Sequence, residues 1–148
     1  VMNRGHYYLV GNHENYDDMS TLRVDRIAHI TVLSERRKPL REIKGYQQQR
    51  TFNVSQYVKE HIYMFGGESI TVSFKAKRSI VNQILDWFDG NVEFSDVTPD
   101  DVVCRVRVNH HAFKYWALQY MQSVKVLSPV SLVTEVKEAI KEGLQQYS

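Results

Sequence analysis

The sequence predicts an α+β protein with a small antiparallel β-structure at its front and a regular mixed unit behind it. Two observations lead to this prediction. Residues 6–33 are rich in aromatic and β-branched side chains interrupted by turn formers, as in short antiparallel strands. From residue 67 onward, alternating and helical apolar spacings follow one another in the order strand, helix, strand, strand, helix, strand, helix. We therefore expect two folding units joined by a linker.

Three short strands are expected in the front unit. His6–Asn12 is aromatic and β-branched, and a loop of turn formers follows it. Residues 21–25 alternate strictly, which would bury Leu22 and Val24 and expose the polar residues between them. A third strand fits residues 28–33. Together these strands predict part of a small antiparallel sheet or barrel.

A linker is expected between the two units. Between residues 34 and 50, six Lys and Arg side chains face only two Glu, so this segment could contact phosphates, although a charged run is more often a solvated linker. Further along, the spacing of Phe52, Tyr57 and Ile62 predicts a short helix over residues 55–61 that places apolar groups on a neighbour. We therefore expect a linker that is docked.

The second unit begins with a strand at residues 70–74, whose apolar side chains alternate. Apolar groups from Ile80 to Phe88 then recur at helical spacing until Asp89-Gly90 ends the helix. Two further strands follow, at residues 92–94 and 102–108.

The rest of the unit repeats this order. Asn109 is placed to cap a helix whose apolar stripe includes Phe113 and Trp116. A last strand spans residues 124–127, and an amphipathic helix follows Pro129. The resulting order, βαββαβ with an extra C-terminal helix, is that of a ferredoxin-like module.

The composition excludes several classes of protein. The 148 residues are 43% hydrophobic and carry 19 Lys and Arg against 17 Asp and Glu, which is enough apolar material for a packed core and argues against disorder. Apolar runs fall short of the about 20 residues that cross a bilayer, so we expect no membrane contact. Cys104 is the only cysteine, which excludes an internal disulfide framework and favours a cytoplasmic location.

Catalytic and metal-binding motifs are missing from the sequence. None of the six histidines shows the i, i+4 helical pairing with a nearby carboxylate that would hold a divalent ion. There is no G-x-S-x-G elbow, phosphate-binding glycine loop or dinucleotide fingerprint. Cys104 shares the apolar face of its strand, where burial favours the unreactive thiol. We therefore expect no enzyme, no cofactor and no metal.

A basic and aromatic surface remains as the candidate site. Arg23 and Arg26 lie at the end of one predicted strand, and Tyr7 and Tyr8 lie on the strand before it. Guanidinium groups bind phosphate bidentately and aromatic rings stack on bases, so this combination suits a short nucleic acid or a nucleotide. The plainer alternative is that the arginines pair with aspartates at positions 17, 18 and 25 on an ordinary surface.

The same residues resemble motifs of the WYL-domain family of bacterial transcription regulators. Tyr7-Tyr8-Leu9 matches the tripeptide that names the family, and Leu22–Ile27 matches its F-R-x-D-R-I element. The stretch from Tyr57 to Glu68, and the chain after it, looks like the C-terminal extension called WCX. The ordered combination covers nearly all of the chain.

This resemblance implies the domain organisation. It implies a partial Sm-like or SH3-like WYL barrel over residues 1–44, a linker over residues 45–66 and a WCX domain over residues 67–148. In the family, the WYL domain carries a basic and aromatic pocket that senses a ligand, and single-stranded DNA or another nucleic acid is the effector for some members. The signal is relayed to a helix-turn-helix that binds promoter DNA.

The resemblance also implies the site residues and partners. Tyr8, Arg23 and Arg26 are the ligand-contacting candidates, and Tyr7 stands where the family usually has Trp. No helix pair precedes the strands, so we expect promoter DNA to be bound only through a helix-turn-helix outside this chain. The first barrel strands have no counterpart before Tyr7. We therefore expect a C-terminal portion of a regulator that forms a homo-oligomer or is disordered over residues 1–40.

One alternative function stays open. The ferredoxin-like module could be a small-molecule or amino-acid sensing and oligomerisation domain with no nucleic-acid ligand, in which case the basic front segment is merely solvated.

Overall fold

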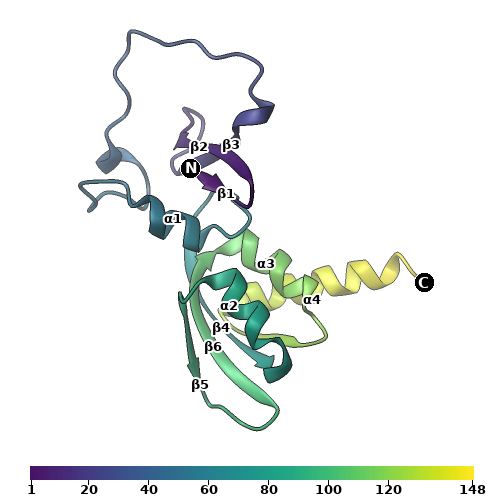
Figure 1. The fold of residues 1–148 in the computed structure, drawn as a ribbon. Helices are drawn as coiled ribbons and strands as arrows, with labels where there is room; N and C mark the ends of the chain where they lie inside the picture. Colours follow the sequence, from purple (N-terminus) through teal and green to yellow (C-terminus); the bar gives the residue numbers. More distant parts are fainter.

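The computed structural model describes residues 1–148 and shows an α+β protein with two antiparallel sheets (Figure 1). The strands are β1 Met2–Asn3, β2 His6–Asn12, β3 Met19–Arg23, β4 Ser69–Lys77, β5 Val92–Ser95, β6 Asp101–Asn109 and β7 Val124–Ser128. The helices are α1 Val54–Glu60, α2 Val81–Phe88, α3 His110–Gln119 and α4 Val130–Gln145, with 3₁₀ turns at Val24–Arg26, Leu40–Glu42 and Arg78–Ile80. The α+β class predicted from the sequence is confirmed. Neither sheet closes into a barrel.

The second unit contains the main hydrophobic core. Its sheet has the strand order β5-β6-β4-β7, and every neighbouring pair is antiparallel. Seventeen buried residues form one cluster between this sheet and its helices. Phe74 on β4, Phe88 on α2 and Trp116 on α3 are completely buried in it. The order of strands and helices expected from residue 67 onward is confirmed.

Two local signals set the ends of these helices. Asp89 and Gly90 both adopt positive φ after α2, at 42° and 70°, which ends the helix where the sequence predicted. Asn109 Oδ1 accepts a hydrogen bond from the Ala112 backbone amide at 3.0 Å and so caps α3, also as predicted. The Asn109 Nδ2 group donates to the Gly66 and Glu68 carbonyl oxygens, at 3.2 and 3.4 Å. This buried amide therefore ties the start of α3 to the beginning of the second unit.

The front unit is a three-stranded sheet in the order β1-β2-β3. The prediction that Leu22 and Val24 are buried is wrong, because Leu22 is 51% and Val24 46% exposed whereas Met19 is 7% exposed. Alternation defines two faces of a strand but does not say which one packs. Here α1 packs on the other face, where the hydroxyl groups of Thr21 and Tyr57 lie 2.8 Å apart.

The prediction of a third strand in the front unit is also wrong. Residues 28–33 have no strand structure, and Ile30, Val32 and Leu33 are 77%, 93% and 65% exposed. A β-prone sequence forms a strand only beside a neighbour that pairs with its backbone. No strand of this chain lies beside the segment, which arches away from the sheet (Figure 1).

The linker is docked, as the sequence predicted. Helix α1 is capped by Asn53 Oδ1, which accepts from the Gln56 amide at 3.0 Å. Tyr57 packs in a small cluster with Met19 and residues of the linker, while Ile62 belongs to the main core. The linker therefore contributes to both cores.

The backbones of the two units come close together at Gly66. A Cβ atom at this position would lie 3.0 Å from the carbonyl oxygen of Met19 on β3. The next residue, Gly67, has φ +102° and its amide donates to the same oxygen at 3.4 Å. Glycine suits this close approach to β3, because a Cβ at Gly66 would force its neighbours to shift. No helix in the structure is both long enough and apolar enough to cross a membrane.

Candidate ligand-binding site

The side chains of Tyr8 and Arg23 are neighbours on the front sheet. The two residues are paired directly across β2 and β3, so their Cβ atoms share one face at a separation of about 5 Å. Tyr8 is half-buried against the small cluster that contains Met19 and Tyr57. Packing therefore orients the Tyr8 ring beside the Arg23 guanidinium.

Arg23 forms a forked ion pair with Asp25. Its Nε donates to Asp25 Oδ1 at 3.0 Å, and its Nη2 donates to Oδ2. The hydrogen bond from Arg23 lowers the pKa of the Asp25 carboxyl, and the same bond raises the pKa of Arg23. The plainer alternative for this arginine, pairing with a nearby aspartate, is therefore present in the structure.

Arg26 completes a small basic cluster around Asp25. It ends the 3₁₀ turn that follows β3, is exposed and forms no ion pair. The charges of His6 and Arg26 also act on Asp25, so three basic side chains surround one carboxylate. A phosphate binds an arginine guanidinium more strongly than a solvated surface carboxylate does. An anionic ligand can therefore compete with Asp25 for Arg23.

His6 is the member of this cluster that the sequence analysis did not include. Its Nδ1 lies 3.1 Å from Arg23 Nη2. Because His6 is two residues before Tyr8 on β2, strand alternation places both on one face, and this signal could have identified it. Tyr7 lies on the opposite face and is 65% exposed, away from the basic cluster.

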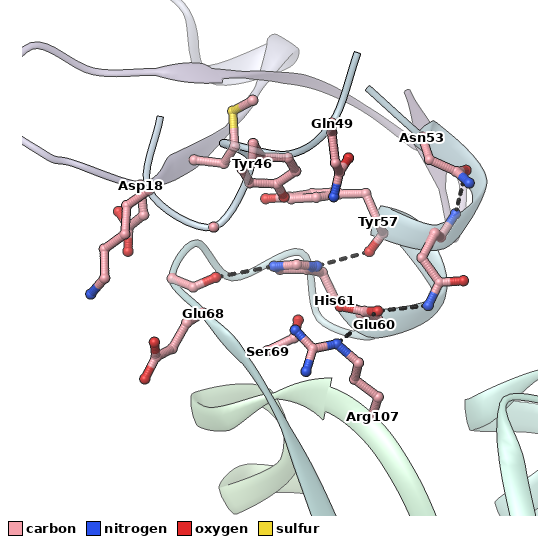
Figure 2. A pocket seen from close by; sticks show the side chains of 15 residues that line it. Asp18, Tyr46, Gln49, Asn53, Tyr57, Glu60, His61, Glu68, Ser69 and Arg107 are labelled. Carbon is pink, nitrogen blue, oxygen red and sulfur yellow. Dashed lines mark hydrogen bonds and ion pairs between the residues drawn. The ribbon is translucent and has the colours of Figure 1, made fainter. Parts of the chain in front are cut away.

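A second polar site lies where the two units meet. A partly open cavity of about 250 Å³ is lined by the front sheet, the linker, α1, the start of β4 and Arg107 of β6 (Figure 2). Most of its lining is polar or charged, and the groups that define it are Asp18, Tyr46, Glu60, His61, Glu68 and Arg107. These residues are far apart in sequence, which is why the sequence analysis missed the site.

Glu60 is a buried carboxylate in the wall of this junction cavity. The residue is 8% exposed. Its Oε1 accepts a hydrogen bond from Gln56 Nε2 at 2.6 Å and lies 3.3 Å from Arg107 Nε. A carboxylate that is withdrawn from water needs such compensation, and Gln56 and Arg107 provide it here.

His61 is buried beside it and stacks on Tyr57 with ring centroids 3.8 Å apart. Its Nδ1 lies 2.8 Å from the Tyr57 carbonyl oxygen, and its Nε2 lies 3.2 Å from that of Gly67. Burial lowers the pKa of His61, although both carbonyl contacts favour the charged ring. Burial also raises the pKa of Tyr46 and Tyr57.

The remaining reactive groups do not form a site. Cys104 is completely buried, and burial raises the pKa of its thiol to about 11. It therefore packs as a small apolar group, as predicted. The structure contains no group of three or more His, Cys, Asp or Glu side chains arranged to hold a metal ion.

Comparison with known families identifies two domains in the chain. A WYL-domain model matches residues 1–32, and a WCX-domain model matches residues 66–144, more than half of the chain. The chain belongs to the WCX-domain family and carries a WYL-domain segment in front. The resemblance seen in the sequence is thereby confirmed. A search of curated proteins found no match.

The two domains indicate a regulator-type sensing region. Tyr8, Arg23 and Arg26 all lie in the WYL segment. The junction cavity lies between the two domains, since Asp18 belongs to the WYL match and Arg107 to the WCX match. The structure thus offers a basic cluster on one domain and a polar cavity at the boundary.

Proposed function

We propose that this chain is the effector-sensing and oligomerisation part of a bacterial transcriptional regulator, and that it binds a nucleic-acid or nucleotide-like ligand, such as single-stranded DNA. The ligand would contact Tyr8, Arg23 and Arg26 in the WYL segment. The proposed function involves no catalysis and takes place in the cytoplasm. The observation that carries it is the half-buried Tyr8 ring beside the Arg23 fork, with the free cation of Arg26 adjacent.

Each residue has a distinct role in this proposal. Arg23 and Arg26 neutralise two phosphates, while the Tyr8 ring packs on a base or a sugar. In structural terms, we propose that the WYL segment is part of an Sm-like barrel and that the WCX domain is a ferredoxin-like module. The strand order β5-β6-β4-β7 supports the second assignment, because it inserts β6 between the two strands that flank α2.

Fluorescence anisotropy of a labelled single-stranded oligonucleotide, in a series of salt concentrations, tests the proposed ligand. Binding should weaken steeply with salt, and Arg26→Ala should reduce the slope of log K against log salt by about 0.7, the value for one phosphate contact on a single strand. Arg105→Ala is the matched control, because Arg105 is exposed and unpaired on the WCX sheet.

The ion pair of Arg23 with Asp25 allows a second test, in which the affinity should rise instead of fall. Asp25→Asn removes the carboxylate that holds the arginine fork, so affinity for the oligonucleotide should rise about twofold or more at low salt. No binding at low salt, or binding that neither Arg26→Ala nor Asp25→Asn changes, would refute the nucleic-acid ligand. A rise in melting temperature with small metabolites but not with oligonucleotide would favour the small-molecule alternative.

We also propose that the WYL segment self-associates through the outer face of its sheet. Tyr7, Leu9 and Leu22 are 65%, 53% and 51% exposed on this face, and Leu9 and Leu22 are paired across β2 and β3. A second copy of the chain would offer the same apolar surface, as a two-fold contact requires. Sedimentation velocity should show a concentration-dependent dimer that Leu22→Glu abolishes. A wild-type chain that stays monomeric at the highest concentrations contradicts this proposal.

A further inference from the structure

The junction cavity is not used by the proposed function, yet its lining comes from both domains. The front of the chain contributes Asp18, Lys44 and Tyr46, and the WCX domain contributes Glu68 and Arg107. Figure 2 shows Asp18 and Glu68 on one side of the cavity and Arg107 below it. A molecule held here would contact the two domains at once.

The charges around the cavity leave a negative excess. Three carboxylates line it, those of Asp18, Glu60 and Glu68, against the two basic side chains of Lys44 and Arg107. Glu60 is already compensated by Arg107. The carboxylates of Asp18 and Glu68 form no ion pair in the structure, so the open side of the cavity favours an ammonium group.

Arg107 offers a complementary group for an anion. Its only side-chain interaction is the one through Nε to Glu60, as Figure 2 shows. The two terminal nitrogens make no hydrogen bond, and the side chain is 55% exposed, so they are within reach of a ligand. A guanidinium with free terminal nitrogens is suited to a carboxylate. Nearby, Ser69 Oγ is buried without a hydrogen-bond partner.

The size of the cavity limits the ligand. Its volume of about 250 Å³ is below the roughly 300–1,000 Å³ of sites for drug-sized molecules. We propose that this cavity binds a small zwitterion of the amino-acid class, with its ammonium group on Asp18 and Glu68 and its carboxylate on the free nitrogens of Arg107. Such a ligand bridges the WYL segment and the WCX domain and fixes their relative orientation.

Thermal unfolding and isothermal titration calorimetry on the full chain test this inference. The probes are L-alanine, L-glutamine and L-lysine at millimolar concentration, with ethylamine and acetate as probes that carry one charge only. At least one amino acid should raise the melting temperature, because a ligand that binds only the native state stabilises it. Neither ethylamine nor acetate should do so at the same concentration.

Isosteric variants locate the site. Asp18→Asn combined with Glu68→Gln should weaken amino-acid binding about tenfold or more, because charge-assisted hydrogen bonds are lost. Glu142→Gln, an exposed position on α4, is the matched control and should leave the affinity unchanged. The inference is overturned if no amino acid binds, if ethylamine alone binds as tightly, or if the double variant binds normally. Arg26→Ala should not affect this binding, which separates it from the proposed nucleic-acid site.

Discussion

The two units of this molecule differ in how much of their apolar surface is covered. The main core has 17 buried residues, all in the WCX domain except Ile62 of the linker, and the alternating apolar side chains of β4 and β6 are buried as the sequence predicts. The small cluster beside the front sheet has only four buried residues, of which Met19 alone lies in the WYL segment, and the outer face of the sheet is exposed. The WCX domain therefore has the means to be stable alone, whereas the WYL segment depends on what packs against it.

The largest expected effect is the loss of a central aromatic in the WCX domain. Phe74→Ala removes a completely buried ring that contacts Phe88, Phe113 and Trp116. It should lower the free energy of unfolding by about 3–5 kcal/mol, as for other Phe→Ala changes in a core. Urea denaturation monitored by circular dichroism measures this. Phe94→Ala, at a 40% exposed site on β5, should have a much smaller effect. Equal losses of unfolding free energy in the two variants would contradict the central role of Phe74 in the core.

A smaller effect is expected from pH, through His61 at the boundary of the two domains. Burial keeps its native pKa below the usual value of 6.5, so the unfolded chain takes up the proton first as pH falls. The contribution of neutral His61 to the free energy of unfolding is therefore complete above about pH 6.5. Below this pH the contribution falls by up to about 1.4 kcal/mol per pH unit. His61→Gln should flatten this dependence in urea denaturation measured at several pH values. His29→Gln, at an exposed position, is the control. A dependence that survives His61→Gln unchanged would refute this assignment.

The smallest effect is expected at the contact that joins the WYL sheet to α1. Tyr57→Phe removes the 2.8 Å hydrogen bond to Thr21, which should cost about 1 kcal/mol. Hydrogen exchange should become faster in β2 and β3 but not in β4 and β6, since only the front unit relies on this contact. Tyr147→Phe, at a 93% exposed position, is the control and should change neither the free energy of unfolding nor the exchange rates. Faster exchange throughout the chain would show instead that the two units unfold together.

The same comparison explains how much could be predicted from the sequence. In the WCX domain, apolar periodicity, the Asp89-Gly90 stop and the Asn109 cap are local signals, and a sheet with one covered face leaves little choice of register. In the WYL segment the strand predicted at residues 21–25 is only partly present, because β3 is Met19–Arg23 and a 3₁₀ turn begins at Val24, and the face predicted to be buried is exposed. The strand expected at residues 28–33 failed because strand formation depends on a neighbour, which no local pattern reveals.

The candidate site was predictable only in part. Tyr8 and Arg23 share a face because a hairpin brings nearby residues together, and sequence motifs report such proximity well. The junction cavity joins Asp18, Glu60 and Arg107 from three distant segments, and nothing in their local sequence marks them as neighbours. They meet because α1 and the Gly66-Gly67 backbone both pack where the two units join.

The close backbone contact at Gly66 has a consequence for building chimeras from these domains. The WCX match begins at this residue, so it is the natural place to join the domain to another sensor. Yet a Cβ at that position would meet the Met19 carbonyl oxygen at 3.0 Å. In a chimera that keeps a WYL sheet in front, any other residue at this position would bring its Cβ against the backbone of β3 and disturb the contact between the two domains. The recombination point that preserves the interface therefore lies before the glycine, so that Gly66 travels with the transplanted domain.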